Sequence, residues 1–218
     1  MTNIIGSLVT MPHKVTTIGL LDELSITARI AGACNAVIKR EDGSLYGDMF
    51  DGEGFVRGML RKGFHPDGAR ALVVGSGGVG SAIAASLAAA GVEAIMLVDM
   101  CEEASQALAA RLRLHYPALT VDTGCRDPSG FDLVVNATPV GMNPGDPLPM
   151  DVEKIRQGCF VGEVVMLSEM TPFLLAAKKR DCVIQVGTDM LFEQIPAYLE
   201  FFDLPTATPE YLRQVSRL

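Results

Sequence analysis

Short apolar runs alternate with longer amphipathic segments between residues 71 and 187. The runs are rich in β-branched residues, which is typical of strands that a parallel sheet buries on both faces. The segments between them repeat apolar residues at a spacing near 3.6, and this period predicts helices. The predicted strands are 71–74, 94–98, 133–135, 160–165 and 182–185, and the predicted helices are 79–90, 102–114 and 171–180. Strand-helix-strand repetition indicates an α/β fold whose parallel sheet carries helices on both sides.

The first fifty residues have a different pattern and predict a second, smaller unit. Residues 4–9, 34–38 and 45–46 have the composition of strands, and the turn Glu41-Asp42-Gly43 joins the last two. The chain from Pro12 onward has helical character.

The end of the chain is predicted to be helical as well. Residues 189–201 have helical character in spite of Pro196, and Thr208-Pro209-Glu210 supplies an N-cap, a first-turn proline and an acidic first turn. We expect these helices to pack on the first unit. The predicted smaller domain is therefore 1–53 with 192–218, and the predicted larger domain is 54–191.

Composition and charge narrow the function classes. The 218 residues are 49% hydrophobic and 20% charged, as in a globular protein, and no apolar stretch reaches the roughly 20 residues of a membrane span. A net charge of −8 with scattered Lys and Arg argues against a nucleic-acid partner. Five cysteines without a C-x-x-C pair and three histidines without ligand spacing predict neither disulfides nor a metal site. With no signal-peptide pattern at the start, we expect a cytoplasmic protein.

The turn after the strand 71–74 has the pattern G-x-G-x-x-G and opens an alanine-rich helix. In this setting the glycines allow a tight turn, close approach of a pyrophosphate and close helix packing, while the helix N-terminus offers free N–H groups. The six residues are Gly75, Ser76, Gly77, Gly78, Val79 and Gly80. They predict a dinucleotide-binding, Rossmann-type domain. The alternative is a plain strand-to-helix turn.

Asp99 closes the next predicted strand, 24 residues after Gly75. A carboxylate at this spacing can accept a hydrogen bond from a ribose 2′-hydroxyl. The segment Met100-Cys101-Glu102-Glu103 that follows contains no arginine for a 2′-phosphate, so NAD is favoured over NADP. The alternative role for Asp99 is to cap the next helix.

Polar side chains gather at the end of the first predicted strand, in Val9-Thr10-Met11-Pro12-His13-Lys14. Taken alone, a lysine after a proline turn is most simply a surface residue, and His13 a local hydrogen-bond partner. Asp51, in G-D-M-F-D-G, is by itself most simply a turn or helix-capping residue.

Together these segments resemble the shikimate/quinate dehydrogenase family, over about residues 8 to 194. That family carries, in order, V-T-x-P-x-K, G-A-x-N, a segment ending in D-G, G-x-G-G-x-G, N-A-T-P-x-G-M and G-x-x-M-L-x-x-Q. This chain has VTMPHK at 9–14, GACN at 32–35, GDMFDG at 47–52, GSGGVG at 75–80, NATPVGM at 136–142 and GTDMLFEQ at 187–194.

The resemblance implies a dehydrogenase that acts on a hydroxyl-bearing carbon of a cyclic acid. It makes Lys14 and Asp51 the catalytic acid–base pair, because hydride removal from an alcohol requires its hydroxyl proton to leave. Thr10, Asn35 and Gln194 would bind the substrate's hydroxyls. Asn136, Ala137, Thr138, Pro139, Val164 (through its backbone) and Gly187 would lie along the cofactor.

The chain also departs from the family pattern. Met49-Phe50 stands where the family has Asn-Thr, and Met166 stands where it has a tyrosine that faces the substrate. We therefore expect a substrate that is less hydroxylated than shikimate, or differently substituted. The family has about fifty residues before V-T-x-P-x-K, including a serine-rich loop for the substrate carboxylate. We expect the smaller domain to lack that part, leaving the strand 4–9 with an unpaired apolar edge.

Three functions remain open on the sequence. The first is an NAD-preferring dehydrogenase of a shikimate- or quinate-like acid, in quinate metabolism or aromatic amino acid biosynthesis. The second is a non-catalytic NAD-binding sensor or interaction protein, and the third is a dehydrogenase of amino-substituted analogues. A homodimer is one possible assembly.

Overall fold

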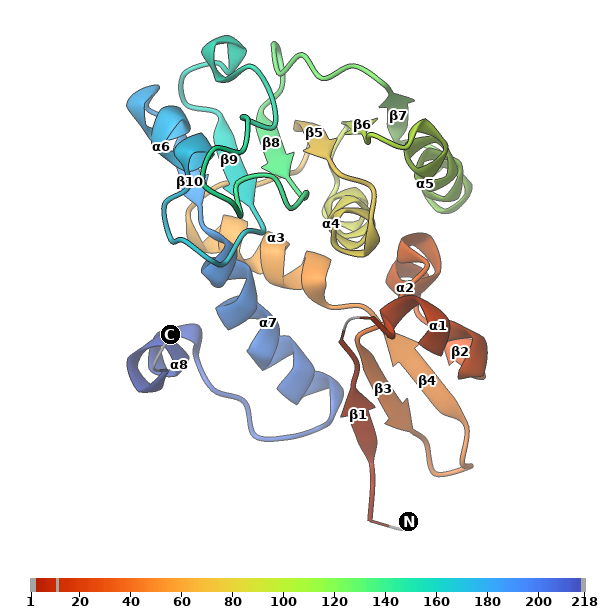
Figure 1. Ribbon diagram of the computed structural model, residues 1–218. Coiled ribbons are helices and arrows are strands. Elements are labelled where there is room, and N and C mark those ends of the chain that lie inside the picture. Colours follow the sequence, from red (N-terminus) through yellow and green to blue (C-terminus); the bar gives the residue numbers. More distant parts are fainter. Residues whose placement is uncertain (1–2, 11, 217–218) are drawn as a thin grey trace.

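Six parallel strands form the larger sheet, in the order β10-β9-β8-β5-β6-β7 (Figure 1). The structure is a computed structural model that describes residues 3–10 and 12–216. The strands are β5 (Arg70–Val74), β6 (Ala94–Val98), β7 (Thr120–Thr123), β8 (Leu133–Asn136), β9 (Phe160–Glu163) and β10 (Val183–Gln185). The order reverses between β5 and β8, as it does in doubly wound dinucleotide-binding sheets. The predicted α/β class with a Rossmann-type sheet is confirmed.

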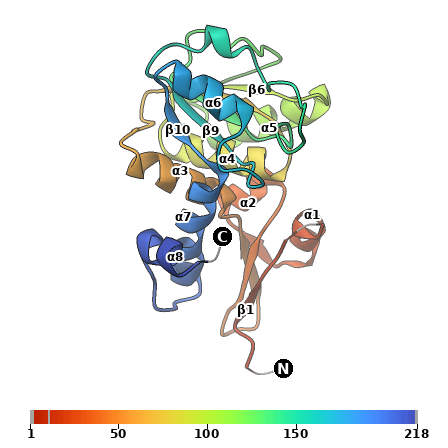
Figure 2. The same ribbon diagram turned by 60° about the vertical axis from the view of Figure 1, so that its left-hand side comes forward.

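Helices cover both faces of this sheet (Figures 1 and 2). On one face α3 (Asp51–Arg61), α4 (Gly78–Ala89) and α5 (Glu102–His115) bury a core that includes Phe55, Ile83 and Leu108. On the other face α6 (Pro172–Lys179) and the short helix η2 (Val152–Lys154) bury Phe173 and Val152 against β8 and β9. The two-sided burial explains why the strands read as continuous apolar runs.

A four-stranded sheet, in the order β1-β3-β4-β2, forms the smaller unit. Its strands are β1 (Gly6–Leu8), β2 (Glu23–Leu24), β3 (Ala36–Lys39) and β4 (Leu45–Asp48). The predicted hairpin is confirmed, because β3 and β4 pair antiparallel on either side of the turn. Within the described residues β1 pairs only with β3, and Leu8 in β1 and Ile4 and Ile5 just before it are exposed.

Between these strands the chain forms α1 (Lys14–Thr17), the short helix η1 (Ile18–Leu20) and α2 (Ile26–Ala31). Helix α2 begins at Ser25, whose hydroxyl accepts a hydrogen bond from the Ala28 N–H, and it packs on α4. The smaller unit is thus anchored on the helical layer of the larger sheet.

Two helices connect the two sheets, α3 and α7 (Gly187–Phe201), and they pack closely on each other. The aromatic end of α7 closes a small core with Phe50 and Ala36 from the smaller unit, and α8 (Pro209–Val215) packs on α7. The end of α7 packs on the first unit, as predicted, whereas α8, capped by Thr208, packs on α7. The boundaries proposed at residues 53 and 191 fall inside α3 and α7, and the division into two domains stays a proposal.

The sequence pattern missed several elements and misjudged one. Strands β2 and β7 and helices α2, α3 and η2 were not anticipated, and the strand expected over 160–165 ends at Glu163. The Val164 N–H still donates to the Asn136 carbonyl at the end of β8, at 3.2 Å, and the Val165 carbonyl already packs against Gly187 at the start of α7.

Candidate active site

An ion pair between Lys14 and Asp51 lies where the smaller unit meets α3. Lys14 Nζ donates to Asp51 Oδ2 at 2.7 Å, and the side chains are 19% and 5% exposed. Lys14 begins α1 and Asp51 begins α3, so residues 37 apart in sequence meet at the first turns of two helices. The ammonium keeps contact with solvent while the carboxylate is buried, which leaves the lysine side of the pair open to a small molecule.

Two amides hold the other oxygen of the Asp51 carboxylate. Asn35 Nδ2 donates to Asp51 Oδ1 at 2.9 Å, and Gln194 Nε2 donates to the same oxygen. The Asn35 Oδ1 atom accepts from the Phe50 N–H at 2.9 Å, which fixes the orientation of its amide. Three residues predicted from separate motifs therefore converge on the carboxylate of a fourth, Asp51.

Backbone hydrogen bonds explain the convergence in the smaller unit. The Val9 N–H donates to the Asn35 carbonyl at 2.8 Å, and the Cys34 N–H donates to the Lys14 carbonyl at 2.9 Å. The Asn35 N–H donates to the Asp48 carbonyl at 2.9 Å. The three segments 9–14, 34–35 and 48–51 are thus tied together before any side chain contributes.

Thr10 occupies a different position from the other predicted substrate residues. It is exposed, and its carbonyl accepts from the His13 N–H at 2.9 Å, which closes the turn before α1. No hydrogen bond joins its side chain to Lys14 or Asp51 in the described part of the chain. Its role toward substrate stays a prediction.

The apolar residues around Asp51 correct one expectation. Met49 and Phe50 are 1% and 6% exposed and pack into the cores of the smaller unit, so they present no apolar surface to a substrate. Of the three departures from the family pattern, Met166 is the one that faces solvent, with 52% of its surface exposed. Tyr198, one turn after Gln194, was missed; its ring packs on Phe50, and burial together with nearby Asp51 raises its pKa.

The glycine turn after β5 has the shape that a pyrophosphate requires. Gly75 has φ +106°, and a Cβ there would lie 2.6 Å from the Ala137 carbonyl oxygen; a Cβ on Gly80 would meet the Gly75 carbonyl oxygen. These two glycines permit the tight turn. A Cβ on Gly77 or Gly78 would meet nothing within 4 Å, so the start of α4 is open where a phosphate would approach.

Asp99 ties this turn to the end of β6. Its Oδ2 atom accepts from the Ser76 N–H at 2.6 Å, and its Oδ1 atom accepts from the Cys101 N–H at 2.9 Å. The N-cap residue of α5 is Cys101 and not Asp99. Asp99 therefore braces the glycine turn, and it also lines the adjoining pocket.

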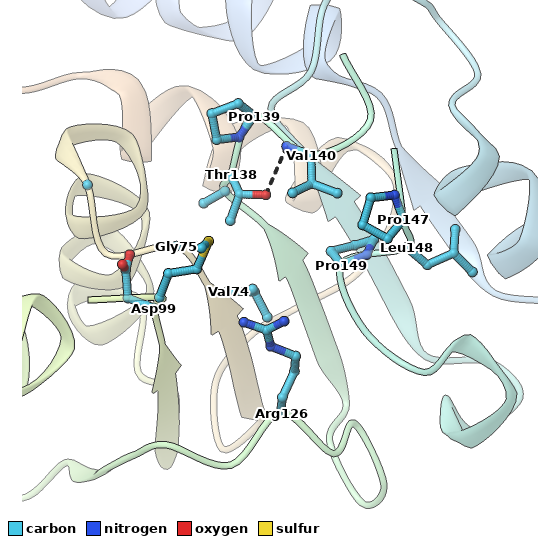
Figure 3. A pocket seen from close by; sticks show the side chains of 13 residues that line it. Val74, Gly75, Asp99, Arg126, Thr138, Pro139, Val140, Pro147, Leu148 and Pro149 are labelled. Carbon is cyan, nitrogen blue, oxygen red and sulfur yellow. Dashed lines mark hydrogen bonds between the residues drawn. The ribbon is translucent and has the colours of Figure 1, made fainter. Parts of the chain in front are cut away.

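A pocket of about 370 Å³ opens at the carboxyl ends of the strands (Figure 3). Six predicted cofactor residues line it, namely Gly75, Gly77, Asp99, Ala137, Thr138 and Pro139. Arg126 lines it as well, and in Figure 3 its guanidinium points inward between Asp99 and Pro149. The expectation that no arginine is available for a 2′-phosphate is wrong, because Arg126 reaches the pocket from the loop after β7.

The remaining predicted cofactor residues lie around this pocket and not in its lining. Ser76, Gly78, Val79 and Gly80 form the turn and the first residues of α4. Asn136 is fully buried below the pocket, where Thr138 Oγ1 donates to its Oδ1 atom at 2.6 Å. Val164 and Gly187 lie beyond β9, beside the start of α7. A strand-end pocket with an open glycine turn fits a dinucleotide, and these residues would hold it.

The described residues contain no helix long and apolar enough to cross a membrane. In residues 3–10 and 12–216 no group of three or more His, Cys, Asp or Glu side chains could hold a metal ion.

The fold and these two sites define a class of α/β proteins with a Rossmann-type sheet and an attached smaller sheet. The sequence matches the shikimate dehydrogenase substrate binding domain over residues 1–37 and the ThiF family over residues 67–102. It is 38% identical over 195 residues to shikimate dehydrogenase (NADP(+)) of Rubrobacter xylanophilus, covering 87% of this chain and 68% of that relative. The chain belongs to the shikimate dehydrogenase family.

Solved structures of similar proteins agree with this assignment. Quinate dehydrogenase from Corynebacterium glutamicum in complex with NAD has a TM-score of 0.85 and 31% identity, covering 98% of this chain and 77% of that one. The ligand-free 5-ketofructose reductase of Gluconobacter sp. strain CHM43 has a TM-score of 0.87 and 30% identity, covering 98% and 78%.

Proposed function

We propose that this protein is an oxidoreductase that interconverts a cyclic hydroxy acid and its keto form by hydride exchange with a nicotinamide dinucleotide. The observation that carries the proposal is the half-open Lys14–Asp51 pair, oriented by Asn35 and Gln194. A purely dinucleotide-binding protein has no need of an ammonium and a carboxylate held 2.7 Å apart outside the dinucleotide pocket.

The pair supplies the proton transfer that the reaction needs. In the oxidation direction the hydroxyl proton of the substrate passes to Lys14 in its neutral amine form, and in the reduction direction the Lys14 ammonium returns it. Asp51 holds the lysine in place through the hydrogen bond between Lys14 Nζ and Asp51 Oδ2. The bound dinucleotide would accept or donate the hydride.

For the cofactor we propose a preference for NAD over NADP. Asp99 offers carboxylate oxygens at the adenosine side of the pocket, which favours a 2′-hydroxyl and repels a 2′-phosphate. Arg126 lines the same pocket and would attract a phosphate, so we expect a moderate preference. Removing Asp99 should shift the ratio of affinities toward NADP, and removing Arg126 should shift it toward NAD.

For the substrate we propose a shikimate- or quinate-like acid. Because the exposed Met166 stands where the family has a tyrosine, binding would depend less on one substrate hydroxyl. Proteins with similar folds are named for different substrates, one as a quinate dehydrogenase and one as a 5-ketofructose reductase. The five cysteines are all unpaired, three of them buried, which supports a reducing compartment such as the cytoplasm.

The experiment is a panel of shikimate, quinate, an amino-substituted analogue and 5-ketofructose, each assayed with NAD(H) and NADP(H). Dissociation constants of both dinucleotides are measured by calorimetry for the unmodified protein, Asp99→Ala and Arg126→Ala. Turnover of a hydroxy acid that Lys14→Ala abolishes supports the proposal. Tight dinucleotide binding without any turnover would favour a non-catalytic protein. Equal dissociation constants for NADP and NAD in the unmodified protein, or a lower one for NADP, would refute the cofactor preference.

A further inference from the structure

Glu163 is a buried acidic side chain that the proposed chemistry does not use. It ends β9, is fully buried, and neither carboxyl oxygen has a hydrogen-bond partner among the described residues. Across the parallel ladder its Cα partner is Asn136, the residue at the end of β8. A buried carboxyl group without a partner is rare and needs a physical explanation.

Among the described residues, the side chains that reach Glu163 are uncharged. Thr171 and Asn136 are the side chains whose hydrogen bonding lowers the pKa of Glu163. Gln185 ends the neighbouring strand β10, and all three side chains are neutral. Helix α6 begins beside it, but Pro172 has no N–H, and the Thr171 hydroxyl oxygen already accepts from the Leu174 N–H. Burial therefore raises the pKa of Glu163 more than Thr171 and Asn136 lower it.

Asn136 connects this carboxyl group to the dinucleotide pocket. Its Oδ1 atom accepts from Thr138 Oγ1 and from the Thr138 N–H, and its Nδ2 atom donates to the Val140 carbonyl at 2.9 Å. These bonds shape the turn 136–140, and residues 137–140 line the pocket. The position of the Asn136 amide therefore sets the pocket wall.

We propose that Glu163 is a positioning residue whose neutral carboxylic acid, set between Asn136 and Thr171, holds the turn 136–140 in the shape that binds the dinucleotide. An uncharged acid can donate through its hydroxyl and accept through its carbonyl, so it satisfies both neighbours without a cation. An ionised carboxylate would instead draw the Asn136 N–H groups away from the Val140 carbonyl. The inference rests on the proposed function, because it assigns the turn to dinucleotide binding.

The test compares Glu163→Gln, which keeps a neutral donor and acceptor, with Glu163→Leu, which keeps the size alone. At neutral pH we expect the NAD dissociation constant of Glu163→Gln to stay within about threefold of the unmodified protein. We expect that of Glu163→Leu to rise about tenfold, which corresponds to one lost hydrogen bond. Glu41→Gln, in the exposed turn between β3 and β4, is the control for a lost surface carboxylate.

The pH dependence gives two further readouts: stability shows whether Glu163 is protonated, and NAD affinity shows whether that proton affects the dinucleotide pocket. Because the folded state holds the proton more tightly than the unfolded state, the unmodified protein loses stability as pH rises from the ordinary glutamate pKa to the raised one. Glu163→Gln lacks this loss. Between the two pKa values, its denaturant midpoint should therefore rise relative to that of the unmodified protein as the pH increases. The NAD dissociation constant of the unmodified protein should also rise with pH relative to Glu163→Gln.

The same pH profile of the NAD dissociation constant in the unmodified protein and in Glu163→Gln would overturn the inference, whatever the stability profiles show. If Glu163→Leu does not fold, the comparison with Glu163→Gln still decides. If no variant binds a dinucleotide, the proposed function fails, while the stability profile still tests whether Glu163 is protonated.

Discussion

Asp51 receives donors from three other segments of the chain, and Lys14 is the only one of them that carries a charge. Lys14→Ala should therefore lower kcat by about 10²- to 10⁴-fold, the usual contribution of a general acid–base group, with little change in NAD affinity. Asp51→Asn, nearly isosteric, should act in the same direction. Stopped-flow and steady-state assays measure kcat, and calorimetry measures NAD affinity.

The control for that substitution is Lys39→Ala, because Lys39 is an exposed lysine at the end of β3. It should leave kcat unchanged. Wild-type turnover in either active-site variant would mean that the pair is structural.

Single residues differ in how far the sequence could locate them. Lys14 and Asp51 stand in ordered motifs, so their pairing could be proposed before the structure. Asn35 and Gln194 were predicted to bind the substrate, and that role stays a prediction; that both also donate to Asp51 depends on side-chain directions that a linear motif does not contain. Arg126 has no motif at all, and only the folding of the loop after β7 brings it beside Asp99.

Among the elements, α3 depends most on close packing. A Cβ on Gly54 would lie 2.5 Å from the Met190 carbonyl oxygen and 2.9 Å from the Gln194 Cβ. Gly54→Ala should therefore separate α3 from α7, cost about 1–3 kcal/mol in the free energy of unfolding, and lower kcat by moving Gln194 from Asp51. Urea denaturation and steady-state kinetics measure the two effects.

Gly19→Ala is the matched control, since a Cβ at Gly19 meets nothing within 4 Å and its φ is ordinary. It should change stability by no more than about 0.5 kcal/mol. If Gly54→Ala is as harmless as the control, the helices are not in the contact described.

The same packing explains which elements the sequence missed. Helix α3 contains Gly52, Gly54 and Gly58, and each interior glycine disfavours a helix by about 1 kcal/mol relative to alanine, so local propensity argues against it. Strand β7 buries only Val121, which leaves no period to detect. Helix α4, rich in alanine and almost wholly buried, was predicted to within one residue at each end.

At the scale of the molecule, the β1 edge of the smaller sheet is an exposed apolar surface that another chain could reach. Within the described residues β1 has one neighbouring strand, and Ile4, Ile5 and Leu8 are 46%, 54% and 58% exposed. Unprotected apolar edges recruit other strands, so we expect this chain to associate as its concentration rises. Sedimentation velocity should show association that Leu8→Lys reduces; a monodisperse monomer at all concentrations would contradict the prediction.

Dinucleotide binding should also be measurable as a stabilisation of the whole molecule, independent of turnover. A ligand at 100 times its dissociation constant stabilises the folded state by about 2.7 kcal/mol, which for a chain of this size raises Tm by about 5–11 °C. NAD should reach this shift, NADP at the same concentration should give less, and Asp99→Ala should narrow the difference. Lys14→Ala should keep the full NAD shift, because Lys14 does not line the dinucleotide pocket. Loss of the shift in Lys14→Ala would mean that the pair and the pocket are one site, and the separation of proton transfer from cofactor binding would fail.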